Sequence, residues 1–469
     1  MRNYNPNNRE EILNYAKKLI GINLKSIITD SKYYQQSAGK GRFGQTLEEA
    51  YFGYSNNNLS EPDFINAGIE LKSTPIIRNK KANNYKAKER LVLGILDYHS
   101  VALERNFNSS HFFFKNKELL LVFYEYLKDE SYLDHVIRIV DLWKFPEPDT
   151  IIIQQDWELI QNFIRLGQAH LLSESLTNYL AASTKGANKY ALRTQPYSEI
   201  RAMQPAFSLK VSYVNHILES LISKSASDDL ALVNPSNIEI LKELGLLKLI
   251  QNSVHDYIGL STNLIITKLN LQINSRAKGF INNLSYKMLN SHSSDLPNEI
   301  KKSNIIIRSI VLKKNRIPKE AISFPSFDFI DICQQTWYES ELFELLDSMK
   351  FIFFIYEIHA NDSENLYFKG IKEWHMPCED INECRNIWES TQSLIMDGNI
   401  TTALSNGKVT TNFIKISDNK PIHVRPHAKN ADDTKELPIP DKITGKNKFT
   451  KQSFWLTPKY LAQQLLQTA

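Results

Sequence analysis

The stretch EPDFINAGIELKST, residues 61–74, holds the side chains of this chain that are best placed to do chemistry. Residues two positions apart on a β-strand face the same side, so Glu70 and Lys72 should point together, while Asp63 lies one short turn upstream. Two carboxylates beside a backbone carbonyl form a set of hard oxygen ligands that suits Mg²⁺. A neighbouring lysine could help to deprotonate a water molecule and stabilise negative charge on a phosphate. The stretch therefore indicates phosphodiester hydrolysis.

The same spacing has a second interpretation, because alternating Glu and Lys is also common on the wet face of a surface strand. Two other stretches are weaker candidates for chemistry. His423 and His427 in HVRPH have no Cys or Glu at metal-ligand spacing, and we expect them at the surface or against DNA. GKGRFG (39–44) lacks the GK[ST] of a P-loop, so it should form a loop before a helix.

Length and composition favour a two-domain protein of the cytoplasm. A chain of 469 residues exceeds one ordinary core, and a net charge of +4 permits a nucleic-acid partner without requiring one. The cysteines Cys333, Cys378 and Cys384 form no CxxC pair, which argues against a disulfide framework or a zinc site. The polar N-terminus does not resemble a signal peptide, and apolar runs such as FIFFIYEI (351–358) are too short to cross a membrane.

Hydrophobic periodicity predicts the elements that must position Asp63, Glu70 and Lys72. The pattern mixes helices and strands without strict alternation, which favours a mixed α/β (α+β) fold. We expect helices at 10–19 and 44–51, strands at 68–77, 90–96, 118–127 and 135–143, and a pair of helices within 156–180.

An internal duplication changes this picture. Three segments of the first half recur in the same order about 230 to 250 residues later: 118–127 matches 349–358, 135–146 matches 366–377, and 204–218 matches 451–466. The sequence therefore predicts two homologous domains, 1–221 and 251–469, joined by a linker at 222–250 that includes the polar run SKSASDD.

Several ordered motifs give the chain a resemblance to a known family. They are GQTLE (44–48), Asp63 with GIELKSTP (68–75), FKNKELLLVFYE (114–125), DWELIQNFIRLGQ (156–168), YLAASTKGANKYAL (179–192) and AFSLKVSYVNHIL (206–218). The first half resembles the MutH-like endonucleases, and the whole chain is similar to the two-domain type II restriction enzymes of that family that cut at GATC, the Sau-type enzymes. The resemblance implies tandem PD-(D/E)xK domains, each with a central mixed sheet flanked by helices.

The resemblance also implies roles for five residues of the first domain. Asp63 and Glu70 would bind Mg²⁺, and Lys72 would be the catalytic lysine. Glu48 would be an accessory acid near the metal, and Lys115, on a strand, would lie near the scissile phosphate.

Two further residues fall in the segment of the family that reads bases. Lys185 and Asn188 would approach the major groove of the DNA. The family pattern has an arginine and a proline before that lysine, whereas this chain has Ser183 and Thr184. Individual base contacts therefore do not follow from the resemblance.

The second copy departs from the first where the chemistry should be. Aligning NIIIRSIV (304–311) with the strand at 68–75 places Ile306 opposite Glu70 and Arg308 opposite Lys72. An isoleucine cannot coordinate Mg²⁺, so this copy should not cut.

HVRPHAKNAD (423–432) nevertheless resembles the base-reading segment. Its Arg425, His427 and Asn430 could donate hydrogen bonds to base edges or phosphates. A repeat kept only for packing is one interpretation of the second copy. A silent domain that binds a second site and activates the first is the other.

The resulting hypothesis is a Mg²⁺-dependent restriction endonuclease that hydrolyses double-stranded DNA at GATC and leaves 5′-phosphate ends. One active site in each chain would imply a DNA-induced dimer or looping between two sites. Two alternatives stay open at this point: a nicking repair endonuclease of the MutH type, and a DNA-binding protein that does not cleave.

Overall fold

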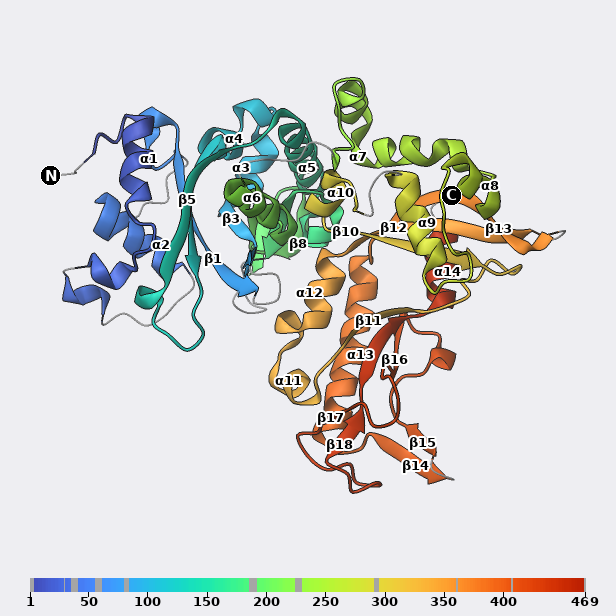
Figure 1. The fold of residues 1–469 in the computed structure, drawn as a ribbon. Helices are drawn as coiled ribbons and strands as arrows, with labels where there is room; N and C mark the ends of the chain where they lie inside the picture. The colour runs from blue at the N-terminus through green and yellow to red at the C-terminus, as the bar shows by residue number, and fades with distance from the viewer. Residues whose placement is uncertain are drawn as a thin grey trace. The chain divides into compact units, whose positions relative to one another are not determined.

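The chain divides into two compact units (Figure 1). In this computed structural model, unit 1 comprises Met1–Leu249 with Pro297–Asn304, and unit 2 comprises Ile250–Leu296 with Ile305–Ala469. The structure describes residues 4–28, 30–34, 41–54, 61–79, 84–184, 192–223, 230–290, 295–359, 362–405 and 408–467. Within these ranges, no helix is long and apolar enough to cross a membrane.

The first unit is built on a four-stranded sheet of order β2-β1-β4-β5. Strand β1 (Glu70–Asn79) runs parallel to β4 (Glu118–Glu125) and antiparallel to β2 (Asn84–Ala87), and β5 (Val136–Lys144) runs antiparallel to β4. The side chains of 119–123 on β4 are all buried, as expected for a strand covered on both faces. Helices α1 (Arg9–Lys17) and α2 (Arg42–Thr46) pack their apolar side chains against the core that this sheet forms.

A second sheet of unit 1, β3-β9-β6, lies beside a long helix. Its strands are β3 (Leu91–Ile95), β6 (Leu180–Thr184) and β9 (Pro205–Leu209), and the hairpin of β7 (Leu192–Gln195) and β8 (Ser198–Met203) precedes β9. The helices of this part are α3 (Tyr98–Leu103), α4 (His111–Asn116), α5 (Glu147–Arg165) and α6 (Val211–Ser223).

The prediction of two helices within 156–180 is wrong for its second half. Helix α5 ends at Arg165, and Gly167 takes the left-handed conformation (φ 68°) that commonly ends a helix. Two short 3₁₀ turns, Ala169–Leu171 and Glu174–Leu176, then lead into β6.

The boundary of the first unit lies beyond the predicted position of 221. Helix α7 (Ile238–Val254), which bends at Gly245, occupies much of the predicted linker. The carboxylate of Glu299 accepts hydrogen bonds from the backbone N–H groups of Leu232 (2.8 Å) and Val233 (3.2 Å). These bonds tie helix α10 (Asn298–Lys302) to the first unit, a long-range contact that local composition does not reveal.

The second unit repeats the two sheets of the first. Strand β10 (Ile305–Leu312) is parallel to β12 (Lys350–His359), which is antiparallel to β13 (Asp362–Trp374), and a second sheet has the order β11-β19-β16. The other elements are β11 (Ile322–Ser326), β14 (Thr401–Ser405), β15 (Lys408–Thr411), β16 (Ile422–Pro426), β17 (Thr434–Glu436), β18 (Lys448–Thr450), β19 (Gln452–Leu456), α8 (Thr262–Lys268), α9 (Phe280–Leu289), α11 (Phe329–Gln334), α12 (Glu341–Ser348), α13 (Cys378–Met396) and α14 (Pro458–Gln467). The prediction of a mixed α/β fold built from two copies is confirmed.

The duplication extends to individual hydrogen bonds. The hydroxyl of Ser110 caps α4 and accepts from the N–H of residue 113, and Ser340 caps α12 in the same way. The amide of Gln161 on α5 donates to two carbonyls at the end of α3 (2.7 and 2.8 Å), and Gln392 on α13 donates to two carbonyls at the end of α11 (2.7 and 3.0 Å). Equivalent serine caps and glutamine hydrogen bonds in both units show that the two copies have the same backbone arrangement at these helices.

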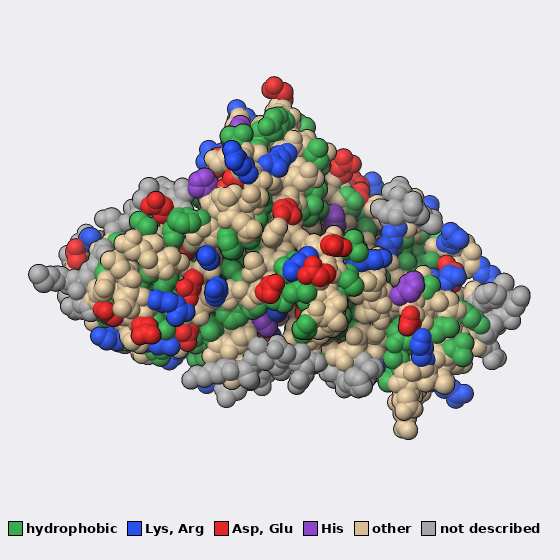
Figure 2. All heavy atoms as spheres, turned by 90° about the horizontal axis from the view of Figure 1, so that it is seen from above, with side chains coloured by type: hydrophobic (Ala, Val, Ile, Leu, Met, Phe, Trp, Pro, Cys, Tyr) green, Lys and Arg blue, Asp and Glu red, His purple; other side chains and the backbone are tan. Residues whose placement is uncertain are grey.

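Charges of both signs are mixed over the molecular surface. On the face shown in Figure 2, the Lys and Arg side chains of the described residues lie among Asp and Glu side chains and do not merge into one basic field. The near balance of 56 Lys and Arg against 52 Asp and Glu agrees with this view. On this face, affinity for an anionic partner would have to come from a few placed groups.

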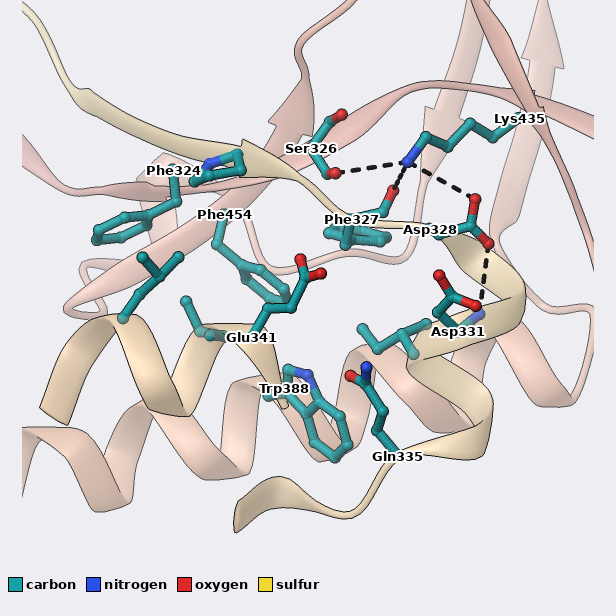
Figure 3. A pocket seen from close by; sticks show the side chains of 14 residues that line it. Phe324, Ser326, Phe327, Asp328, Asp331, Gln335, Glu341, Trp388, Lys435 and Phe454 are labelled. Carbon is teal, nitrogen blue, oxygen red and sulfur yellow. Dashed lines mark hydrogen bonds and ion pairs between the residues drawn. The ribbon is translucent and has the colours of Figure 1, made fainter. Parts of the chain in front are cut away.

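The second unit contains a cavity of about 180 Å³ beside α11 and α12 (Figure 3). Phe327, Trp388 and Phe454 contribute aromatic walls. The ammonium group of Lys435 lies 3.1 Å from the carbonyl oxygen of Phe327 and 3.6 Å from a carboxylate oxygen of Asp328. This cation is already neutralised, so it ties β17 to the segment that precedes α11.

We expect the substitution Asp156→Ala to destabilise the protein by about 3 kcal/mol. The buried Asp156 carboxylate on α5 accepts hydrogen bonds from the N–H groups of Asn178, Tyr179 and Leu180 (2.7, 2.6 and 2.9 Å), which would lose their acceptor. Urea-induced unfolding followed by circular dichroism measures the change. The exposed Glu158 on the same helix is the control, and its replacement by alanine should change stability by less than about 0.5 kcal/mol. Equal effects of the two substitutions would contradict this account.

Candidate active site

A tight loop brings Asp63 back beside the first residue of β1. The backbone groups of Phe64 and Ile69 exchange two hydrogen bonds (2.9 and 3.3 Å), which close the loop around the 3₁₀ turn Ile65–Ala67. Gly68 ends that turn with φ 66°, a conformation that a side chain at this position would strain. The glycine in GIELKST is therefore part of the geometry of the site.

Each of the two carboxylates of the site is oriented by a backbone N–H group. The N–H of Asp63 donates to Oε2 of Glu70 (3.1 Å), and the N–H of Leu71 donates to Oδ2 of Asp63 (2.9 Å). Glu70 is only 2% exposed. One oxygen of each acid is thus held by a backbone N–H group.

Two lysines approach the second oxygen of Glu70. The ammonium group of Lys72 lies 2.6 Å from Oε1, and that of Lys115 lies 3.5 Å from the same oxygen. Lys115 also donates to the carbonyl of Glu61 (3.1 Å). The predicted strand position of Lys115 is wrong, because it belongs to the last turn of α4, yet its side chain reaches the acids.

Glu48 comes to the site on a π-helical segment, Leu47–Phe52, that continues α2. Such segments are rare and are frequent at functional sites. Gly44, one turn earlier, allows the helix to approach β1, because a Cβ atom there would lie 3.0 Å from the Ser73 hydroxyl. Burial, and then the charge of Asp63, raises the pKa of Glu48 to about 7.

The acids of the site feel one another's charge. Burial, and then the charge of Glu70, raises the pKa of Asp63 to about 6, while Lys72 opposes the increase. Carboxylates that repel each other in a half-buried pocket bind a cation favourably.

The donor set fits a hard divalent cation with few protein ligands. Among the described residues, no three His, Cys, Asp or Glu side chains lie together as a complete ligand set. Asp63 and Glu70 supply two carboxylates, and Mg²⁺ commonly binds through one or two carboxylates and keeps several waters. The arrangement suits Mg²⁺ and leaves Glu48 as a neighbour rather than a required ligand.

Tyr54 is a neighbour of the site that the sequence did not single out. Its hydroxyl is buried and has no hydrogen-bond partner among the described residues, and its ring packs edge-on against Phe64. Burial, followed by the charges of Asp63 and Glu48, raises its pKa. No sequence signal marks this residue, because its position follows from the end of the π-helical segment.

Two groups of known proteins are similar to this chain. Residues 52–156, which include β1, β4 and both lysines of the site, match a family profile described as DNA mismatch repair enzyme MutH. The type II restriction enzyme Sau3AI of Staphylococcus aureus is 33% identical over 488 aligned residues, which cover 97% of this chain and 98% of that enzyme. The chain belongs to the MutH-like family of type II restriction endonucleases. Its substrate is DNA.

MutH repair proteins match a smaller part of this endonuclease. The MutH of Shewanella amazonensis is 28% identical over 220 residues, which cover 45% of this chain and 95% of that protein. A MutH of another Shewanella strain is 30% identical over 223 residues, with the same two coverages. More than half of the endonuclease therefore lies outside the part that matches these repair proteins.

The register of the sheets places the second copy's residues opposite those of the site. Glu70 pairs with Leu119, whose partner on β5 is Trp143; Ile306 pairs with Phe351, whose partner on β13 is Trp374. By this register Arg308 takes the place of Lys72. Leu345 takes the place of Lys115, because each is the fifth residue after the capping serine.

The predicted DNA-reading residues fall into two groups. Lys185 and Asn188 lie outside the described residues. Arg425 and His427 are exposed at the end of β16, and Asn430 uses its side-chain oxygen to hold the next turn.

The expectation of a surface position for His423 is wrong. His423 is buried on β16 and forms a hydrogen bond with the hydroxyl of Thr457 (3.1 Å). Burial, and then the charge of Arg425, lowers its pKa to about 4. It is a neutral core histidine.

The raised pKa of Glu48 predicts a pH-dependent cost to stability. The folded protein binds this proton more tightly than the unfolded chain does, so stability falls as the pH rises from 4.5 to about 7 and stays low above that range. In metal-free buffer we expect Glu48→Gln to stabilise the protein by about 2 kcal/mol near pH 8, after allowance for solvent screening, and to have little effect near pH 5.

Urea unfolding at the two pH values measures this difference. Glu49→Gln is the matched control, because Glu49 accepts a hydrogen bond from Tyr33 on the other side of the helix. A gain that is the same at both pH values, or the same in both variants, would contradict the assignment.

Proposed function

We propose that this restriction endonuclease cuts duplex DNA at GATC, with Mg²⁺ as cofactor and one cutting site in each chain. The observation that carries the proposal is the meeting of Asp63, Glu70 and Lys72 at the start of β1, with Lys115 beside them. The resemblance of the whole chain to the Sau-type enzymes supports GATC as the site.

Each residue of the site has a separate role in hydrolysis. Asp63 and Glu70 would hold the cation, which when bound would lower the pKa of a water molecule and neutralise charge on the scissile phosphate. Lys72, released from Glu70, orients the attacking water or donates to a phosphate oxygen. Lys115 donates to the phosphate, where negative charge develops. The oxygen of the attacking water bonds to phosphorus, the P–O3′ bond breaks, and O3′ takes up a proton from solvent, which leaves 5′-phosphate and 3′-hydroxyl ends.

Glu48 suits a proton-accepting role at the edge of this site. In the metal-free protein, burial and the charge of Asp63 raise the pKa of Glu48 to about 7. A bound cation would lower this value, so that the carboxylate is ionised when the enzyme is loaded. Glu48 then accepts a proton from water beside the site.

The second unit is proposed to bind DNA without cutting it. Ile306 and Leu345 replace a metal-binding acid and a phosphate-binding lysine, whereas β16 keeps Arg425 and His427 exposed. Occupation of a second GATC site by this unit would activate the first through a difference in DNA affinity between the active and inactive arrangements.

The alternatives are less well supported. A nicking repair endonuclease would need only the part of the chain that MutH proteins match, which is 45% of it. A DNA-binding protein without cleavage would have no use for a buried carboxylate with two lysines beside it.

Lys72→Met should reduce cleavage of a GATC duplex roughly a thousandfold, since it removes a charge that acts at the phosphate. The matched control is Arg308→Met at the corresponding position of the second unit, which should cut a single-site duplex at the wild-type rate. Single-turnover cleavage with saturating enzyme and Mg²⁺ measures both. A loss in Arg308→Met with none in Lys72→Met would show that the cutting site is assigned to the wrong unit, and equal losses would contradict a single cutting site.

Plasmids with two GATC sites should be cut roughly tenfold faster than plasmids with one, if the second unit acts as an effector. An oligonucleotide duplex that carries GATC, added in trans, should restore the rate on the single-site plasmid. Equal rates on both plasmids, with no response to the duplex, would reject the effector role and leave the cutting site unaffected.

A further inference from the structure

An arginine and a tryptophan form a stacked pair on the second unit's DNA-reading strand. The guanidinium of Arg425 on β16 lies 3.8 Å from the centre of the Trp455 ring on β19. The indole N–H of Trp455 donates to the backbone carbonyl of Arg425 (3.3 Å), so the ring is held under the arginine by a second contact. Arg425 is exposed and has no carboxylate partner among the described residues.

The same ring supports the neighbouring histidine. His427 meets the edge of Trp455, with ring centres 5.1 Å apart, and its Nδ1 forms a hydrogen bond with the Ser453 hydroxyl (2.9 Å). The register explains why one ring reaches both residues. Trp455 lies directly opposite His423, Arg425 follows two residues later on the same face of β16, and His427 lies just beyond the end of that strand.

The first unit has no such pair at the corresponding positions. Leu209 and Leu456 occupy equivalent places in the two sheets, so Ser208 corresponds to Trp455 and Ser183 to Arg425. The hydroxyl of Ser208 donates to that of Ser183 (2.7 Å), and both serines are buried. The two copies therefore differ at one cross-strand pair: a closed pair of hydroxyls in the first and a supported cation in the second.

We propose that Trp455 is a positioning residue for DNA recognition, which holds Arg425 and His427 in the orientation that reads a base edge. The inference rests on the proposed DNA binding by the second unit. A guanidinium recognises guanine through two parallel hydrogen bonds, and this contact requires a fixed plane. Stacking on an indole face fixes that plane and leaves the N–H donors free.

The choice of tryptophan at this position has a physical reason. An exposed arginine has many rotamers, and ordering it on binding lowers affinity. The Trp455 ring orders the side chain before DNA arrives, because it offers a flat face and anchors itself through its N–H. Phenylalanine would keep the face and lose the anchor, and leucine would lose both.

The test is equilibrium binding of the full-length protein in EDTA to a duplex with one GATC site and to the same duplex with that site scrambled. We expect Trp455→Leu to reduce the ratio of the two affinities about five- to tenfold, and Trp455→Phe to reduce it less than about threefold. The salt dependence of binding should not change in either variant, because no charge is removed. Arg425→Gln should reduce the same ratio at least as much as Trp455→Leu.

Tyr338→Leu is the matched control. It removes another ring of the second unit that lies under an arginine, Arg385, 5.6 Å away, but on the segment before α12 and not on the DNA-reading strand. Thermal unfolding identifies any variant that has lost its fold.

The outcomes distinguish the positioning role of Trp455 from DNA reading by the second unit. Loss of discrimination in both Trp455→Leu and Arg425→Gln, with Tyr338→Leu unchanged, supports the positioning role. Loss in Arg425→Gln alone would overturn the role of Trp455 while leaving DNA reading by the second unit intact. No loss in either would overturn DNA reading by this strand, and with it the positioning role.

Discussion

A buried carboxylate is the feature on which the rest of the first unit depends. An ionised acid taken out of water destabilises a fold by several kcal/mol, as an order of magnitude, unless it is paired. Glu70 obtains its partners from three directions: the N–H of Asp63, the ammonium group of Lys72 and that of Lys115. Each partner needs an element behind it, namely the loop closed at Gly68, strand β1 and the capped helix α4. The loop, the sheet and the helix are therefore arranged around the two carboxylate oxygens of Glu70. A divalent cation could replace the lysine ammonium groups at these oxygens.

The second unit shows what the same scaffold does once that charge is removed. With Ile306 in place of the acid there is no ion to desolvate, and replacing a buried ion pair by apolar residues is often neutral or stabilising. If the second copy served only for packing, its other residues would have been free to change. Yet Ser340 still caps α12 and Gln392 still clamps α11, while β16 presents Arg425, which has no carboxylate partner among the described residues. The second unit keeps these structural hydrogen bonds and adds the Arg425–Trp455 pair. A role in DNA binding would explain this combination better than a role in packing alone.

The sequence predicted those parts of the fold and site that depend on neighbouring residues. The core strands were predicted correctly because their apolar runs are long. Glu70 and Lys72 were predicted on one face because side chains alternate along a strand with a period of two. Features that depend on distant contacts escaped prediction. The helix expected after Arg165 does not form up to residue 180, because three backbone N–H groups at the end of this segment donate to the Asp156 carboxylate. The segment leads into a strand instead. Likewise, helix α10 joins the first unit only because Glu299 accepts from a segment some 66 residues away.

The charge distribution explains why a single arginine can matter in a DNA-binding protein of this size. A net charge of +4 gives little long-range attraction, and salt screens charges beyond about 8 Å at physiological ionic strength. Near β16, Lys451 and Lys435 are each paired with an aspartate, Asp433 and Asp328, so they add little to the field at the strand. Arg425 differs from them, because an indole face supports it without neutralising it. If the second unit binds DNA as proposed, its recognition would depend less on the number of cations than on the orientation of one, because orientation distinguishes one base from another where charge alone cannot.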